Sequence, residues 1–361
     1  DATTLPLISR YMRTWYLGAL FMSLPMLGNG ILISSGDSRA ASRFMMLGTL
    51  LNAVLDPIMI FGYLGFPAMG IQGAALATVL AQAVSTAWLM YLLRVKHRLL
   101  AFERWPRREY VESVRKILRL GVPSMLSMVL MPISAGVITR ILGGFGNEAV
   151  AACGAAGRIE MFAFIIPMAL GISMMAFVSQ NYGARRLDRV HEAITVSTRF
   201  AMLYGGFIAV VFFLAAPLLA RIFTRDPKVA ATLILYIRIV SFGYGMMEVH
   251  RYCGIILTGL HKPLASTALN AIRVLVLLVP LASLGSWLFG IPGVFCGRLI
   301  TDLTVGSLGL IWVRRACASV DAGIDRGAGS RAACAARGAP AAVARGDAAG
   351  HARSVAVAVV A

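Results

Sequence analysis

A single carboxylate stands inside a long apolar stretch, residues 44–78, and this is the place best suited to bind a cation. The carboxylate is Asp56, and Asn52 lies four residues before it. Residues four apart share one face of a helix, so the amide and the carboxylate are expected to stack. An ionised acid at membrane depth costs roughly 2.5–3.5 kcal/mol on insertion scales, which favours a functional role. We therefore predict a proton or cation site at Asn52 and Asp56.

A structural role is the alternative for the same residues. Asp56 precedes Pro57. Asp is a favoured N-cap and Pro a favoured first helical residue, so Asp56 could cap a helix that restarts after a proline break. Asn52 could equally serve as an interhelical hydrogen-bonding residue, which membrane helices commonly carry.

The composition of the chain indicates a protein that crosses a membrane several times. Hydrophobic residues make up 58% of the 361 residues and charged residues only 14%, and the mean hydropathy is +0.77. These values exclude an ordinary soluble domain. A span needs about 20 apolar residues. On that criterion the sequence predicts nine spans, at about residues 14–35, 44–63, 70–93, 118–142, 149–178, 196–219, 233–258, 265–288 and 292–313.

The net charge of +18 follows membrane sidedness rather than a nucleic-acid surface. Loops on one side carry most of the cations: Arg39, Arg43, Arg94, Lys96, Arg98, Arg104, Arg107, Arg108, Arg115, Lys116, Arg185, Arg186, Arg189, Lys262, Arg314 and Arg315. Loops on the other side hold only Arg10, Arg13, Arg221, Arg225 and Lys228. This asymmetry is the positive-inside bias, and it predicts that the 94–117 loop is cytoplasmic. No basic face of a soluble domain is visible, so we expect no nucleic-acid partner.

Charged residues within the apolar segments of the second half predict a hydrated cavity there. Glu248 and Arg251 are three apart and Arg298 and Asp302 four apart, so each pair could neutralise itself along one helix. Three others lack such a neighbour: Arg158 and Glu160, two apart, and Arg273. They need partners on other helices or water. The candidate cavity set is Glu160, Arg158, Glu248 and Arg273.

No enzyme or metal motif is found. The chain contains no P-loop, no catalytic Ser/His/Asp set and no Cys/His metal spacing. Three of the five cysteines, Cys153, Cys253 and Cys296, lie in apolar segments, where a small buried hydrophobic role is expected. We expect neither catalytic residues, nor a metal, nor a cofactor.

An internal repeat relates the two halves of the chain. Tyr11-Met12-Arg13 returns as Tyr236-Ile237-Arg238, and Gly30-Ile31-Leu32-Ile33-Ser34 as Gly254-Ile255-Ile256-Leu257-Thr258. Leu64-Gly65 with Gly70-Ile71-Gln72-Gly73 returns as Leu284-Gly285 with Gly290-Ile291-Pro292-Gly293. The offset of 220–225 residues indicates a duplicated half. An even number of helices separates the copies, which predicts a parallel repeat with substrate handled between two lobes.

The repeat and the composition together define the expected domains. Residues 1–93 would be the last three helices of a first lobe, 94–117 a basic inter-lobe loop, and 118–315 a complete six-helix second lobe. Three helices precede the repeated segment in the second half but none in the first, so three further helices are expected before Asp1. From Ala316 an Ala/Arg/Gly tract begins, and 316–361 is expected to be a disordered low-complexity tail.

Several motifs resemble one transporter family. The stretch N-x-x-x-D-P at 52–57, G-I-Q-G-A-A-L-A-T at 70–78, S-Q-N-Y-G-A at 179–184 and the two-half repeat are similar to the multidrug and toxic compound extrusion (MATE) family. The resemblance covers about residues 11–315. It implies an all-α polytopic membrane protein with a two-lobe parallel-repeat transporter fold, of which about nine of twelve transmembrane helices are present.

The resemblance also implies an activity. Members are secondary antiporters that export amphipathic cations in exchange for protons or sodium by alternating access. The proton-coupled branch uses first-lobe residues that correspond here to Tyr11, Asn52, Asp56 and Thr78. A second branch carries an acid about ten residues past a G-x-P. After Gly121-Val122-Pro123 that place falls near Met131-Pro132, which has no acid.

The expected protein is therefore a multi-pass antiporter of the bacterial inner membrane. It would act as a monomer on small amphipathic cations, with the lipid bilayer as its other partner and H⁺ or Na⁺ as the coupling ion. One alternative is a flippase of lipid-linked sugars, which would need Arg158, Arg251, Arg273 and Arg298 in one cavity. The other is a non-functional remnant of a transporter, in which case the chain alone would export nothing.

Overall fold

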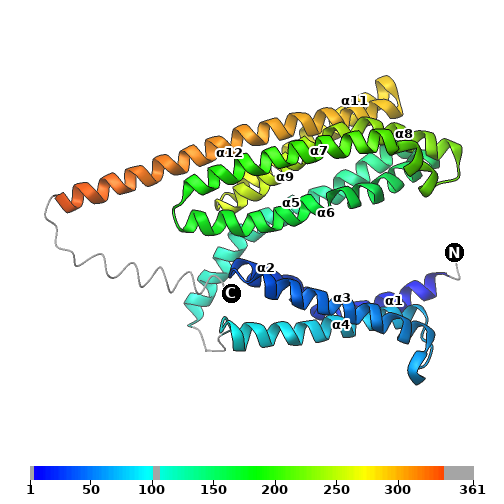
Figure 1. Ribbon diagram of the computed structural model, residues 1–361, viewed down its shortest axis with the longest axis horizontal. Helices are drawn as coiled ribbons and strands as arrows, with labels where there is room; N and C mark the ends of the chain where they lie inside the picture. The colour runs from blue at the N-terminus through cyan, green and yellow to red at the C-terminus, as the bar shows by residue number, and fades with distance from the viewer. Residues whose placement is uncertain (1–3, 101–105, 337–361) are drawn as a thin grey trace. The chain divides into compact units, whose positions relative to one another are not determined.

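The computed structural model describes the backbone of residues 4–100 and 106–336 and the side chains of 9–100 and 106–319. Its described part is helical throughout (Figure 1). The first helices are α1 (Thr4–Leu17), α2 (Ala19–Ser34), α3 (Ser38–Phe61), the short η1 (Tyr63–Gly65), α4 (Ile71–Tyr91) and η2 (Leu92–Lys96). After them come α5 (Arg107–Gly143), α6 (Asn147–Gly183), α7 (Leu187–Phe223), α8 (Pro227–Val240), η3 (Ser241–Gly243), α9 (Tyr244–Gly259), α10 (Pro263–Ala271), η4 (Ile272–Leu278), α11 (Val279–Phe289) and α12 (Ile291–Ala336).

The candidate membrane spans follow the order expected from the sequence. Among the described residues, eight helical segments are long and apolar enough to cross a bilayer. A ninth results if the bent pair Ser9–Leu17 and Ala19–Ser34, with 53° between its parts, is one span. The prediction of an all-α polytopic fold is confirmed, and the nine predicted spans correspond to the eight segments together with this bent pair.

Two segments differ from their expected structure. The helix α5 begins at Arg107, so the second part of the 94–117 loop is helical. The helix α12 continues to Ala336, although 316–361 was expected to lack structure. Alanine and arginine are strong helix formers, so helical propensity extends α12 without an apolar face. Residues 337–361 of that expected tail lie outside the described part.

The described residues divide into two compact units, one up to Val114 and one from Arg115 on. In the first unit α4 lies against α1, α2 and α3. Asp37 links two segments at the end of the first unit that the charge bias assigns to the cytoplasm. Its side chain accepts a hydrogen bond from the Ala40 N–H at 2.9 Å, and it pairs with Lys96 at 2.8 Å and His97 at 3.2 Å. The Lys96 ammonium, with the Ala40 N–H, holds the pKa of Asp37 below its usual range.

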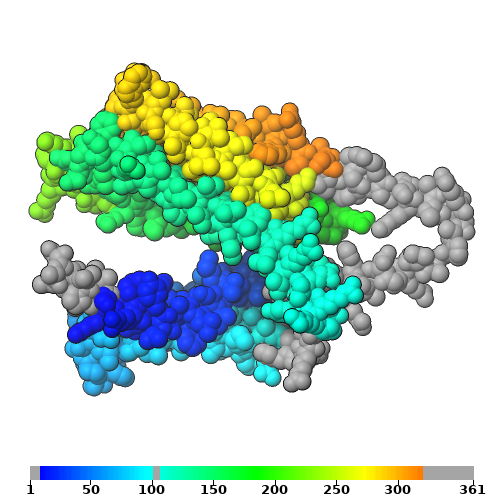
Figure 2. Space-filling model, turned by 180° about the vertical axis from the view of Figure 1, so that it is seen from behind, coloured from blue at the N-terminus to red at the C-terminus, as the bar shows by residue number. Residues whose placement is uncertain are grey.

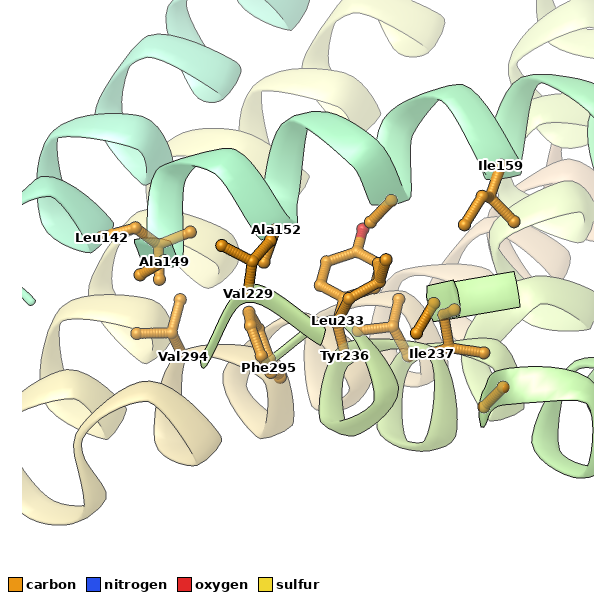
Figure 3. Packing of buried hydrophobic residues seen from close by; sticks show 14 of the residues in the cluster. Leu142, Ala149, Ala152, Ile159, Val229, Leu233, Tyr236, Ile237, Val294 and Phe295 are labelled. Atoms are coloured by element: carbon orange, nitrogen blue, oxygen red, sulfur yellow. The ribbon is translucent and has the colours of Figure 1, made fainter. Parts of the chain in front are cut away.

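In the second unit α6, α7 and α9 run side by side (Figure 1). One of its two apolar cores joins Leu142 of α5, Ala149 and Ala152 of α6, the inner face of α8, and Val294 and Phe295 of α12 (Figure 3). Elsewhere the contacts are backbone to backbone: a side chain at Gly205 would collide with Gly245, and one at Gly293 with Gly285. Such small-residue contacts are typical of helices packed in a membrane.

Candidate functional site

The first unit brings three of its four predicted site residues into one hydrogen-bonded set. Asn52 on α3 donates through Nδ2 to Oδ1 of Asp56 and to Oγ1 of Thr78 on α4, both at 3.3 Å. Thr78 in turn donates to the Ala74 carbonyl at 3.0 Å. The amide therefore joins the two helices and touches the only ionisable group of the set. All three side chains are half-buried.

The helix-cap interpretation of Asp56 is wrong. Asp56 and Pro57 both lie inside α3, which runs without a break from Ser38 to Phe61. A proline inside a helix removes one donor but need not end the helix when packing supports both sides. The residue that does cap α3 is Asp37, through the Ala40 N–H.

A cavity of about 290 Å³ adjoins the hydrogen-bonded set. It is enclosed by α2, α3 and α4, and its wall combines thioethers, amides and hydroxyls. The lining residues are Met22, Pro25, Met26, Asn29, Phe44, Met45, Gly48, Thr49, Asn52, Thr78, Gln82 and Ser85. None of these side chains is charged. The lining meets a carboxylate only through Asn52, which is hydrogen bonded to Asp56.

Tyr11, the fourth predicted residue, is placed apart from this set. It lies half-buried on α1, which packs against α4. No hydrogen bond joins its hydroxyl to a side chain within the described ranges.

The sequence analysis did not predict a second link between α2 and α4. Pro25 lies inside α2 and leaves the Phe21 carbonyl without its helical donor. Thr86 on α4 donates to that carbonyl at 3.2 Å.

The second unit contains a chain of buried charges that connects three spans. Glu160 on α6 accepts two hydrogen bonds from Arg298 on α12, at 2.9 and 3.1 Å. The hydroxyls of Tyr236 and Tyr244 donate to the same carboxylate at 2.8 and 3.2 Å. Arg298 also donates to the Tyr236 hydroxyl. Figure 3 shows the Tyr236 ring among apolar side chains, with its oxygen directed at α6.

The charge chain continues along α12 to a third span. Asp302 is fully buried and pairs with Arg273 of η4 at 3.0 Å, and its other oxygen lies 3.8 Å from Arg298. Arg298 therefore pairs mainly with Glu160 rather than with its own helical neighbour, contrary to the expectation of a self-neutralising pair. The four groups are two cations and two anions. Their sum is zero, which is how charges persist in an apolar lobe.

The other two candidates of the second lobe lie outside this chain. Glu248, with 1% of its side chain exposed, pairs with Arg251 one turn later on α9 at 3.1 Å, as the spacing predicted. Arg158 is exposed on the face of α6 opposite Glu160. Only Glu160 and Arg273 of the predicted cavity set thus share one network. The sequence missed Tyr236 and Tyr244, because a tyrosine in an apolar span gives no sign that it serves a carboxylate.

The described side chains include no group of three His, Cys, Asp or Glu residues that could hold a metal ion. The chemically active groups of both clusters are carboxylates, with amide, hydroxyl or guanidinium partners. Neither pairs a nucleophile with a base.

Comparison with known proteins relates most of the chain to transporters. Residues 123–284 match the family model described as MatE. A protein of Shewanella oneidensis named FAD transporter is 35% identical over 322 residues, which cover 89% of this chain and 71% of that protein. YpnP of Bacillus subtilis, named a probable multidrug resistance protein, is 27% identical over 81% of this chain and 64% of its own length. The Thermotoga maritima NorM, named likewise, is 27% identical, and the chain spans half of it.

Solved structures agree with these relatives. A crystal structure of a Vibrio cholerae MATE transporter matches 88% of this chain and 72% of its own, with a TM-score of 0.82 and 25% identity. A Pyrococcus furiosus transporter of the MOP superfamily matches 86% and 70%, with a TM-score of 0.77 and 26% identity. The identity, the shared spans and the motifs lead to one conclusion: this chain belongs to the multidrug and toxic compound extrusion (MATE) family of membrane transporters and is not an enzyme.

Proposed function

We propose that the protein is a secondary antiporter that exports amphipathic cationic compounds in exchange for protons, using the first-lobe site as its coupling centre. The observation that carries the proposal is the placement of Asp56. It is hydrogen bonded to Asn52, and Asn52 lines the first-lobe cavity beside Thr78. A proton taken up by Asp56 can therefore alter a contact in the cavity wall directly.

The coupling step follows from the hydrogen-bond inventory of this set. Ionised Asp56 can only accept, and Asn52 donates to it. Protonation turns one carboxyl oxygen into a donor and removes the charge. The Asn52 amide then loses its strongest acceptor and keeps Thr78. Because Asn52 spans α3 and α4, its rearrangement changes how these helices pack, and a ligand can bias the two packings only through such differential contacts.

Two substrate classes have support. The thioether-rich and uncharged cavity wall, with Met22, Met26 and Met45, suits soft and variable apolar surfaces, and ionised Asp56 adds a negative charge for a cation. The second candidate is FAD, because the Shewanella relative carries that name. The amides and hydroxyls of the same wall offer donors and acceptors that a flat heterocycle could use.

The flippase alternative requires four free arginines in one cavity. Here Arg298 and Arg273 are neutralised by Glu160 and Asp302, Arg251 by Glu248, and Arg158 faces away. The structure therefore gives no support for a cationic groove that would bind a pyrophosphate.

We propose a monomer in the bacterial inner membrane, with the 94–117 segment in the cytoplasm.

The test is transport into and out of proteoliposomes under an imposed pH gradient, with ethidium and FAD as alternative substrates. The whole product of the gene is used, since the chain spans 71% of the Shewanella relative. Asp56→Asn should preserve protein yield and abolish proton-coupled efflux, because the amide cannot titrate. Asn52→Ala should reduce efflux less, since the titrating group stays. Asp37→Asn, the same change at the N-cap of α3, is the matched control.

The outcomes separate the candidates. Ethidium movement that depends on the pH gradient and on Asp56 supports the proposal, and FAD movement with the same dependence supports the second candidate. Wild-type efflux by Asp56→Asn at wild-type yield would leave Asp56 a structural residue and remove the coupling centre. If a sodium gradient drives efflux as fast as the pH gradient does, sodium is the coupling ion.

A further inference from the structure

A groove on the second unit lies apart from both charged sites. It is formed between the start of the α10–η4 span and the far end of α12, and its volume is about 400 Å³. Figure 2 shows these two parts side by side, in yellow and orange. Eight of its lining residues carry the argument: Lys262, Ile272, Leu308, Ile311, Trp312, Arg315, Ala316 and Ser319.

Two cations stand at the upper edge of the groove, on the side that the charge bias assigns to the cytoplasm. The Lys262 ammonium donates to the Ala316 carbonyl at 3.2 Å and to the Ser319 hydroxyl at 2.7 Å. An ammonium has three donors, so one is left to point outward. Arg315 is exposed and, among the described side chains, has no hydrogen bond or ion pair. Among the side chains that the structure describes, those up to residue 319, no acidic residue lines the groove.

Below the cations the lining turns apolar. Ile272 of η4 and Leu308 and Ile311 of α12 form its floor, and 51% of Ile311 remains exposed. Trp312 stands between the two zones, one turn of α12 below Ala316. Tryptophan prefers this level at a membrane interface because its ring is apolar and its N–H is polar.

We propose that this groove binds the headgroup and upper acyl chain of an anionic phospholipid of the cytoplasmic leaflet. Arg315 and the free donor of Lys262 take the phosphate, and Ile272, Leu308 and Ile311 take the chain. Basic pockets between membrane helices on the cytoplasmic side recognise such headgroups. A free phosphate would use the cations but leave the apolar floor uncovered, which favours a lipid as the occupant.

The site has a structural consequence for the second lobe. Lys262 already joins the loop before α10 to α12 through Ala316 and Ser319. A phosphate shared by Lys262 and Arg315 would add a second link between the same two spans. Bound anionic lipid is therefore expected to stabilise the packing of the α10–η4 span against α12.

The experiment measures lipid binding to the purified protein by native mass spectrometry. Dioleoyl phosphatidylglycerol is titrated against dioleoyl phosphatidylcholine, and glycerol phosphate serves as the soluble competitor. The decisive variant is Arg315→Gln, because among the described side chains Arg315 has no hydrogen bond or ion pair that the change would remove. Arg314→Gln is the matched control: the same charge is lost at the same height, but Arg314 lies outside the groove. Lys262→Gln is the second variant.

Wild type and Arg314→Gln should prefer phosphatidylglycerol equally, and Arg315→Gln should bind it about fivefold to tenfold more weakly. Lys262→Gln should weaken binding at least as much. Equal binding by Arg314→Gln and Arg315→Gln would overturn the proposal. So would equal affinity for the two lipids, or displacement of phosphatidylglycerol by an equal concentration of glycerol phosphate, which would make the groove a site for free phosphate.

Discussion

Removing one member of the Glu160–Arg298 pair should destabilise the second unit far more than removing both. Glu160→Gln leaves the four-group chain with a charge of +1, Arg298→Met leaves −1, and the double variant leaves zero. Glutamine can still accept from Tyr236 and Tyr244, so the change isolates the charge. The side chains of Glu160 and Arg298 are 13% and 20% exposed, so most of each is shielded from solvent.

The magnitude follows from measurements on buried pairs. Breaking such a pair from one side costs about 3–5 kcal/mol, because a charge is left buried without compensation. At about 2–4 °C per kcal/mol for a unit of this size, each single variant should lower the thermal midpoint by roughly 6–20 °C. Arg298→Met should be the more severe, because Asp302 also loses its second cation.

The assay is the thermal midpoint of the detergent-purified protein, measured for wild type, both single variants and the double variant. If the two effects are additive, the double variant should lose roughly 6–10 kcal/mol of stability relative to wild type. If the two charges compensate each other, the loss should be about 3 kcal/mol or less. Arg158→Gln, two residues from Glu160 but exposed, controls for charge removal on α6 and should change stability by no more than about 0.5 kcal/mol. Additivity of the two single effects would refute the view that Glu160 and Arg298 compensate each other.

Three further predictions concern other parts of the chain. Pro167 frees the carbonyl of Ala163, which accepts a hydrogen bond from the Tyr204 hydroxyl at 2.8 Å. Tyr204→Phe should therefore cost about 1–3 kcal/mol of stability. An unchanged thermal midpoint would show that water replaces the hydroxyl. The lowered pKa of Asp37 adds stability above the unfolded pKa of about 3.9, and that stability is lost as pH falls through the lower folded value. A pH series of thermal midpoints should show this acid loss in wild type and not in Asp37→Asn; parallel curves would contradict it. In a cysteine-free background, an impermeant thiol reagent should label Asn147→Cys in intact cells but not Trp105→Cys, and the opposite pattern would reverse the assigned orientation.

The span pattern and the first-lobe site were accessible from sequence because both depend on local spacing. A run of about 20 apolar residues can cross a bilayer only as a helix, so the nine spans follow from composition. Asn52 and Asp56 share a helix face by their four-residue spacing, and the structure joins them. Thr78 came from family resemblance, and the structure places it within hydrogen-bonding distance of Asn52.

The second-lobe network could not be predicted, because its partners are far apart in the chain. Arg298 is four residues from Asp302, and spacing alone suggested that they neutralise each other. Packing instead brings Glu160 against Arg298 from 138 residues away, with better geometry than the local pair. A similar limit applies to hydroxyls that serve proline-freed carbonyls, such as Thr86 and Tyr204. The prolines can be read from the sequence, but the helix that supplies each donor cannot.

The separation of Glu160 from Arg298 also sets an order of events during synthesis. At about 5–20 residues per second, the 138 residues between them take about 7–28 s to make. During that interval α6 contains a carboxylate whose main partner does not yet exist. The last helix of the lobe is thus expected to complete the burial of one of its earliest, and nascent chains stopped before Arg298 should leave α6 poorly inserted.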